Sequence, residues 1–243
     1  MLPPSPARRP ARRARPLVAA VAVLATLSLA ACGGGDEAAA EKTPTQVLAA
    51  AKKQFDDAAS VRIELSTDSV PEAGNGVLGA SGVVTDAPAF EGDVKVLLSG
   101  ITATVPVTSV GGTVYAKLPL TTKYAAIDPE EYGAPDPADF GDPDQGLSSL
   151  LTEVEGAKKG EQTRDGDQVL TTYSGTLPGA SVKRIVPSAD ARSDYPTKVG
   201  VDDSGQATSV TITGPFFSDG ADVTYDVGFS QYDRDVTIAK PTS

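Results

Sequence analysis

Apolar and polar residues alternate with a period of two in many short stretches after residue 60. This alternation is typical of strands that bury one face and leave the other in water, and it favours an antiparallel sheet. The sequence therefore predicts several such strands. Their apolar positions are Val61, Ile63 and Leu65; Val94, Val96 and Leu98; Ile101, Ala103, Val105 and Val107; Val114, Ala116 and Leu118; Val210 and Ile212; and Val223, Tyr225, Val227 and Phe229.

Two stretches have helical spacing instead. The first begins where Thr43 can cap a helix and Pro44 suits its first position. Its apolar face would hold Val47, Leu48, Ala51, Phe55 and Ala58. The second covers residues 146–154, with Leu147, Leu150, Leu151 and Val154 on one face. The acidic stretch 128–144 before it contains prolines and glycines, so a loop is predicted there.

The N-terminal residues have a different composition from the rest of the chain. Five arginines and no acidic residue precede an apolar run from Leu17 to about Leu29. This order is typical of a secretory signal peptide, and the run is too short to span a bilayer well. It ends in Leu29-Ala30-Ala31-Cys32, which matches the bacterial lipobox. In sequences that resemble a lipobox, the cysteine is acylated and the chain is cut just before it.

Cys32 is the single cysteine of the chain. It is predicted to carry the lipid anchor, and the alternative is a buried free thiol near an ordinary cleavage site. Two or more acyl chains anchor a protein stably, since each buried methylene contributes about 0.8 kcal/mol. The predicted organisation is a signal peptide over 1–31, a flexible tether over 32–42 and a single domain over 43–243.

Charge and composition exclude several function classes. Removal of residues 1–31, with their five arginines, leaves 212 residues and changes the net charge from −11 to −16. Such an acidic chain does not suit nucleic-acid binding. The chain has no histidine, which excludes Ser-His-Asp triads and histidine general bases, and we expect no cofactor and no metal site. The acidic stretch lacks the glycine and ligand spacing of an EF-hand. Catalysis by a carboxylate pair alone is the remaining enzymatic alternative.

The order of several motifs along the chain resembles a known family. The lipobox and the first helix are followed by "SVRIEL", "FEGDVKVLL", "GGTVYAKL", "DPDQGLSSLLTEVEGAKKGEQTRDGDQVLTTYSG" and "VTIAKP". In order and spacing these resemble the actinobacterial lipoproteins LppX, LprA, LprF and LprG, and the LprG-like members in particular. The resemblance covers roughly Thr45 to Pro241, and no catalytic motif contributes to it.

The resemblance implies an α+β fold, in which a curved antiparallel half-barrel has helices on its concave face and encloses an apolar cavity. It also implies a function without catalysis: binding of multi-acylated lipids or lipoglycans and their carriage across the cell envelope. From the residue pattern alone, the same positions equally suit an ordinary packed core. The residues expected to contact lipid are Val94, Val96, Leu98, Ile101, Val105, Val107, Val114, Leu147, Leu150, Leu151 and Val154.

The resemblance also suggests partners and a location. An acylated ligand, the plasma membrane through the lipid anchor, and a membrane efflux transporter are the expected partners. The expected location is the outer face of the plasma membrane. The main alternative is a lipoprotein with a solid core that serves as a scaffold in the envelope. A solute-binding lipoprotein for an importer is a further alternative, but such proteins usually have two lobes and a longer chain.

Overall fold

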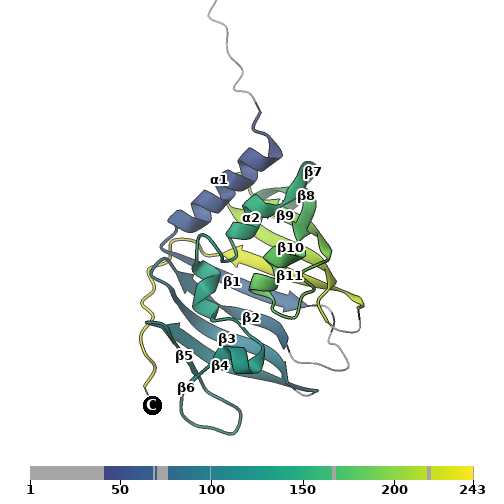
Figure 1. The fold of residues 1–243 in the computed structure, drawn as a ribbon. Helices are drawn as coiled ribbons and strands as arrows, with labels where there is room; N and C mark the ends of the chain where they lie inside the picture. The colour runs from purple at the N-terminus through teal and green to yellow at the C-terminus, as the bar shows by residue number, and fades with distance from the viewer. Residues whose placement is uncertain are drawn as a thin grey trace, which may run out of the picture. The chain divides into compact units, whose positions relative to one another are not determined.

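The alternating segments pair into one open antiparallel sheet (Figure 1). The structure is a computed structural model that describes residues 41–67, 69, 76–98, 100–165, 168–217 and 220–242, without the side chains of Leu98 and Asp165. Within these residues the sheet has eleven strands in the order β6-β5-β4-β3-β2-β1-β11-β10-β9-β8-β7. Neighbouring strands are antiparallel throughout, and β6 and β7 form the two edges. The predicted open antiparallel sheet is thus confirmed.

The helices and strands occupy the following ranges. The strands are β1 (Ser60–Thr67), β2 (Gly76–Thr85), β3 (Ala89–Leu98), β4 (Ile101–Val110), β5 (Thr113–Ala116), β6 (Ala125–Ile127), β7 (Glu155–Asp165), β8 (Gln168–Pro178), β9 (Asp194–Val201), β10 (Ala207–Pro215) and β11 (Asp222–Ser230). The helices are α1 (Pro44–Asp57), α2 (Ser149–Glu153) and α3 (Gly179–Ile185), and two 3-10 helices are η1 (Pro129–Tyr132) and η2 (Pro137–Gly141).

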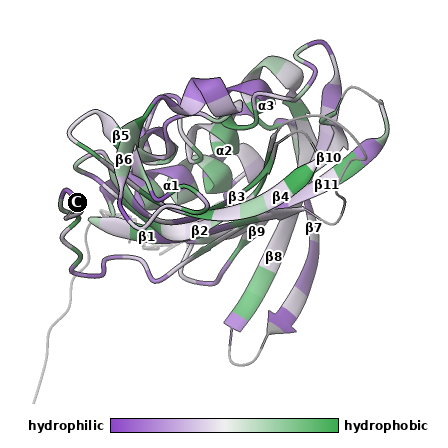
Figure 2. Cartoon of the chain, turned by 90° about the horizontal axis from the view of Figure 1, so that it is seen from below, coloured by the Kyte–Doolittle hydropathy of each residue, from purple (hydrophilic) through white to green (hydrophobic). Residues whose placement is uncertain are grey.

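The order of the strands explains how the sheet is covered. Strands β1 to β6 form one meander, β7 to β11 form a second, and β1 joins the two by pairing with β11. Strands β6 and β7 follow each other in the sequence but lie at opposite edges of the sheet. The connection over residues 128–154 therefore has to pass from one edge to the other, and it carries η1, η2 and α2. Figure 2 shows α1, α2 and α3 on the same side of the sheet.

Helix α1 begins at the predicted residues. Thr43 and Gln46 form a capping box, in which the side chain of each accepts a hydrogen bond from the backbone N–H of the other. The buried face carries Leu48, Ala51 and Phe55, and the helix contacts α2, β7 and β10. Local capping and apolar spacing thus agree with the packing of this helix, and the prediction is confirmed.

Aromatic side chains fill the core under the helices. The Phe216 ring lies 5.0 Å from the Tyr195 ring and 4.5 Å from the Tyr225 ring. The Phe55 ring of α1 meets the Phe229 ring edge-on at 5.4 Å. The Tyr225 hydroxyl donates a 2.5 Å hydrogen bond to the carbonyl oxygen of Val77 in β2. Each of these rings is buried, so this part of the core is tightly filled.

Several elements differ from the prediction. The second helix is confined to Ser149–Glu153, because the N–H groups of Gly146 and Leu147 bond to the carbonyl oxygens of Asp142 and Phe140 in turns before it. The predicted loop over 128–144 contains two 3-10 helices. The predicted alternating stretches do not include β2, β6, β7, β8 or β9. Strand β7 lacks apolar alternation because it is an edge strand with mostly exposed residues. Figure 2 shows the β7–β8 hairpin projecting away from the other strands.

Candidate functional site

One wall of a cavity is formed by β2 to β5 and the residues just after β5. Register places the in-facing residues in rows, with Val94 opposite both Ala80 and Val105, and Val96 opposite Ala103. Side chains at alternate positions of a strand point to one face, so these residues share the concave face. The wall residues are all aliphatic or proline, and they are Val77, Ala80, Val94, Val96, Ala103, Val105, Val107, Val114, Ala116, Leu118 and Pro119.

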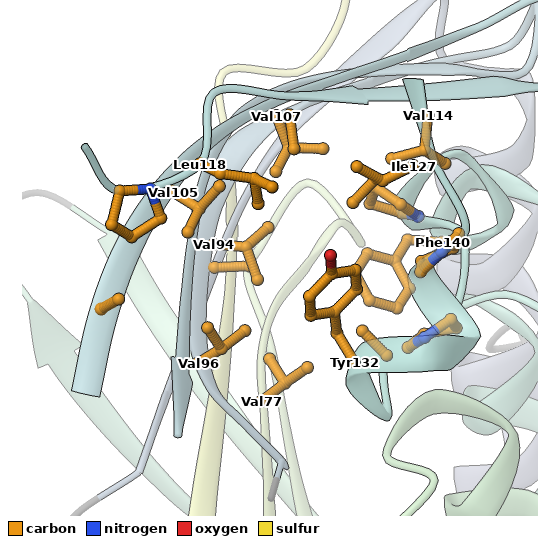
Figure 3. A pocket seen from close by; sticks show the side chains of 18 residues that line it. Val77, Val94, Val96, Val105, Val107, Val114, Leu118, Ile127, Tyr132 and Phe140 are labelled. Carbon is orange, nitrogen blue, oxygen red and sulfur yellow. The ribbon is translucent and has the colours of Figure 1, made fainter. Parts of the chain in front are cut away.

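The opposite wall is formed by residues 127–140, which we call the cover segment. Asp128 caps η1 by accepting a hydrogen bond from the N–H of Glu130, and Asp136 caps η2 in the same way through Ala138. These caps hold the acidic side chains at the start of each turn while apolar ones face the sheet. The cover residues that line the cavity are Ile127, Pro129, Tyr132, Ala134, Pro135, Pro137 and Phe140 (Figure 3).

The cover segment is held to the sheet by apolar contacts. Helix η2 packs on β2, β3 and β4. Among the described residues, no hydrogen bond joins residues 129–140 to these strands. The cover segment also carries Asp139. Partial burial raises the pKa of this carboxyl above its ordinary value, and the neighbouring acids Asp136 and Asp142 raise it further. Apolar contacts can be exchanged for contacts with a ligand, so residues 129–140 can move away from β2, β3 and β4 without breaking hydrogen bonds to them, while Ile127 stays paired with Val114 of β5.

The cavity is apolar and small. Its volume is about 80 Å³, counted as the space open to the centres of water molecules. That space exceeds the roughly 10–15 Å³ needed for one water, but the walls offer very little polar surface to hold water. Among the described side chains that line it, the hydroxyl of Tyr132 is the only polar group. Figure 3 shows this oxygen pointing between the two walls.

An aromatic ring occupies the concave face next to the cavity. Phe90 is fully buried on the same face of β3 as Val94. A Cβ atom at Gly82 would lie 2.5 Å from the Phe90 ring, and one at Gly92 would lie 2.9 Å from it. The ring therefore lies directly over two opposed glycines, and only glycine leaves room for it there. At this end the sheet face is filled by an aromatic ring, whereas from Val94 onward it is lined by small aliphatic residues.

Comparison with known proteins identifies the family. The model of the LppX_LprAFG lipoprotein family matches residues 43–238. The chain belongs to this family. No curated protein sequence matches the chain.

Two solved structures have the fold of this LppX_LprAFG protein. LprF from Mycobacterium bovis aligns with a TM-score of 0.68 and 19% identity, over 82% of this chain and 97% of that chain. Lipoprotein LppX from Mycobacterium tuberculosis aligns with a TM-score of 0.58 and 19% identity, over 81% of this chain and 100% of that chain. At this identity the likeness shows the fold, and it confirms the half-barrel architecture that the sequence resemblance implied.

The structure brings together five of the eleven residues predicted to contact lipid. They line the cavity as part of the sheet wall and are Val94, Val96, Val105, Val107 and Val114. Ile101 pairs with Leu98 at the end of β4, two residues before Ala103. Its side chain is 70% exposed and does not line the cavity. The Leu98 side chain lies outside the described residues. The other four, Leu147, Leu150, Leu151 and Val154, are buried in the core and do not line this cavity.

Sequence reasoning missed the entire cover segment as a site. Its acids and prolines indicated a solvated loop, and its apolar residues follow neither a helical nor a strand period. The available signal was the recurrence of proline, alanine and aromatic residues between the acids, at Pro129, Tyr132, Ala134, Pro137 and Phe140. These residues line the cavity, together with Ile127 and Pro135.

The described residues also bear on metal binding and on membrane insertion. Within the described ranges, no three acidic or cysteine side chains gather as metal ligands would. No helix in the part of the chain that the structure describes is long and apolar enough to cross a membrane. The predicted signal peptide and the lipidation site Cys32 lie outside the described residues, and both stay predictions.

Proposed function

We propose that this protein binds the acyl chains of multi-acylated lipids or lipoglycans between the sheet wall and the cover segment, and carries them across the cell envelope. The observation that supports this most is the lining of the cavity, where one phenol is the single polar side-chain group among the described residues. Water in such a space finds few hydrogen-bond partners. Each methylene group that moves from water into it contributes about 0.8 kcal/mol of favourable free energy. The cavity therefore suits hydrocarbon chains.

The small volume requires movement of the cover segment. About 80 Å³ is less than the roughly 300–1,000 Å³ of typical ligand pockets, and several acyl chains need more room still. The apolar attachment of the cover segment allows it to move outward as acyl chains replace its contacts with β2, β3 and β4. We propose that the cavity opens on loading and closes to this volume when it is empty.

The anchor and the partners complete the proposal. Acylation of Cys32 would hold the protein at the outer face of the plasma membrane, where an efflux transporter could supply lipid. The carrier itself would perform no reaction. The alternative, a scaffold lipoprotein without cargo, predicts that no lipid copurifies with the protein.

A lipid analysis tests the proposal. The full chain is purified from an actinobacterial host, and lipids in its organic extract are quantified by mass spectrometry. In parallel, the variant Val94→Trp places a large ring in the cavity. The control Val83→Trp places the same ring on the other face of the sheet, because Val83 lies an odd number of residues from the cavity-lining Ala80 on the same strand.

We expect lipid with the parent protein and with Val83→Trp, and much less with Val94→Trp. Since the cavity accepts added volume, Val94→Trp should reduce the free energy of unfolding by less than about 1 kcal/mol, against about 1–3 kcal/mol for overpacking a filled core. A parent protein free of lipid, together with a strongly destabilised Val94→Trp, would support the scaffold instead.

A further inference from the structure

Tyr132 is held in a fixed position at the end of η1. The Asp128 side chain caps the start of this turn through the N–H of Glu130. Gly133 ends it in the left-handed region, at φ 70°, and its N–H bonds to the carbonyl oxygen of Glu130. The N–H of Ala134 bonds back to the carbonyl of Pro129 at 3.1 Å. Hydrogen bonds on both sides of the residue thus fix its backbone, and with it the direction in which the Cα–Cβ bond leaves the turn.

The Tyr132 hydroxyl has no hydrogen-bond partner among the described residues. The side chain is half-buried and its oxygen points toward Val107 and Ile127 across the cavity (Figure 3). The oxygen is not among the fully buried polar atoms, so it can meet water while the cavity is empty. Hydrocarbon that fills the cavity would exclude this water, which is unfavourable for the hydroxyl unless a partner enters with the ligand. A pure hydrocarbon would leave this hydroxyl unpaired, whereas a ligand with an acceptor at the right depth would satisfy it.

Charge around the hydroxyl narrows the choice of acceptor. The cavity lining contains no lysine or arginine. Glu130 and Glu131 adjoin Tyr132 in the sequence, and Asp136 and Asp139 follow on the same cover segment. A free carboxylate would leave water for an apolar lining without a cation to balance it, under a cover segment that is itself acidic, which is unfavourable. A neutral ester carbonyl is also an acceptor and does not meet this repulsion.

We propose that Tyr132 recognises the neutral ester carbonyl of an acyl ligand, by donating a hydrogen bond to it within the cavity. The inference rests on the proposed function and specifies the ligand further: the ester group enters the cavity together with its acyl chain. The phenol is a suitable donor because an ester offers acceptors and no donor. Acyl esters are then favoured over both free fatty acids and hydrocarbons of the same length.

Displacement of a neutral fluorescent probe tests this inference. Delipidated protein is loaded with N-phenyl-1-naphthylamine, which is then displaced with methyl dodecanoate, sodium dodecanoate or tridecane. The variant is Tyr132→Phe, which removes only the hydroxyl. The control is Tyr115→Phe, which removes the same atom from a tyrosine that packs under Lys240 and lies outside the cavity lining.

We expect the parent protein to bind methyl dodecanoate about fivefold to tenfold more tightly than tridecane, which corresponds to one net hydrogen bond. Tyr132→Phe should abolish this preference by weakening ester binding and somewhat strengthening tridecane binding, because no hydroxyl is then left unpaired beside the hydrocarbon, while Tyr115→Phe should change neither. The carboxylate should bind more weakly than the ester to the parent.

The outcomes separate the two proposals. Equal weakening of ester and tridecane in Tyr132→Phe, or no change in either, would overturn the role of Tyr132 while the cavity remains a site for acyl chains. A preference for the carboxylate over the ester would also overturn it. A parent protein that binds neither the probe nor any of the three ligands would overturn the proposed function itself.

Discussion

The part of the sheet under the helices presents large side chains, whereas the part under the cover segment presents small ones. Strands β9 to β11 and the residue after β10 contribute Tyr195, Tyr225, Phe229 and Phe216, and α1 adds Phe55 between them and the solvent. Strands β2 to β5 contribute valines and alanines to the cavity wall. Protein interiors are closely packed where side chains from two layers interdigitate. Here the side chains of the first part fill the space between the layers, whereas those of the second part touch across the layers but leave a cavity between them.

The helices that cover the first part also carry larger side chains than the cover segment over the second part. Helices α1, α2 and α3 present leucine, valine, isoleucine and phenylalanine at helical spacing, and polar bonds join them to one another. Arg184 of α3 donates a 2.6 Å hydrogen bond to Glu153 of α2, and Ser148 donates one to Asp56 of α1. The cover segment presents mainly proline and alanine, with two rings. The cavity therefore lies where small side chains of the sheet face short side chains of the cover segment.

The largest expected effect is a loss of stability in the filled part. Phe216→Ala should lower the free energy of unfolding by about 3–5 kcal/mol, because it leaves a cavity between the Tyr195 and Tyr225 rings. Phe140→Ala removes the same atoms next to an existing void, and we expect about half that loss. Urea denaturation measures both variants. Equal losses would contradict the contrast between the two parts of the core.

The opposite change, from small to large, should separate the two parts again. Val199→Phe adds volume at a fully buried position and should cost about 1–3 kcal/mol. Val105→Phe adds the same volume in the cavity wall and should cost less than about 1 kcal/mol. Melting temperatures of the two delipidated variants give the comparison. If Val105→Phe is the more damaging of the two, the cavity is not available space.

A hydrogen bond between helices α1 and α2 provides a third test. Ser148 is buried, and its hydroxyl donates a 2.5 Å bond to the Asp56 carboxylate. Ser148→Ala should cost about 1–2 kcal/mol, because the carboxylate loses a buried donor. Ser188→Ala is the control, since the buried Ser188 hydroxyl has no partner among the described residues and its removal should be nearly neutral. The prediction fails if both variants unfold at the same urea concentration as the parent.

The smallest expected effect concerns the charge of the cover segment. Burial and two neighbouring acids raise the pKa of Asp139, so its charged form is less favourable in the folded protein than in the unfolded one. Stability is therefore lost as the pH rises through the pKa of this group. Asp139→Asn should raise the melting temperature slightly at pH 7 and leave it unchanged near pH 3, where the parent is protonated in both states. A gain that persists at pH 3 would show that charge is not its cause.

Local features of the sequence were sufficient for part of the candidate site. The alternation of Val94 and Val96, and of Val105 and Val107, placed these residues on one face of adjacent strands, and they do share the cavity wall. The spacing of Leu147, Leu150 and Leu151 was also sufficient to predict burial. It was not sufficient to say which core they enter, because periodicity reports the buried face of an element and not the element that lies opposite.

The sequence by itself determined six of the sheet-forming segments, the capped start of α1 and the family, because these depend on residues close together in the chain or on motif order. Tertiary structure alone decided that β6 and β7 lie at opposite edges, so that residues 128–154 must cross the sheet. That crossing turns an acidic, proline-rich stretch into a cavity wall and brings Tyr132 opposite Val107 (Figure 3). Pairing of distant strands sets this arrangement, and no local pattern records it.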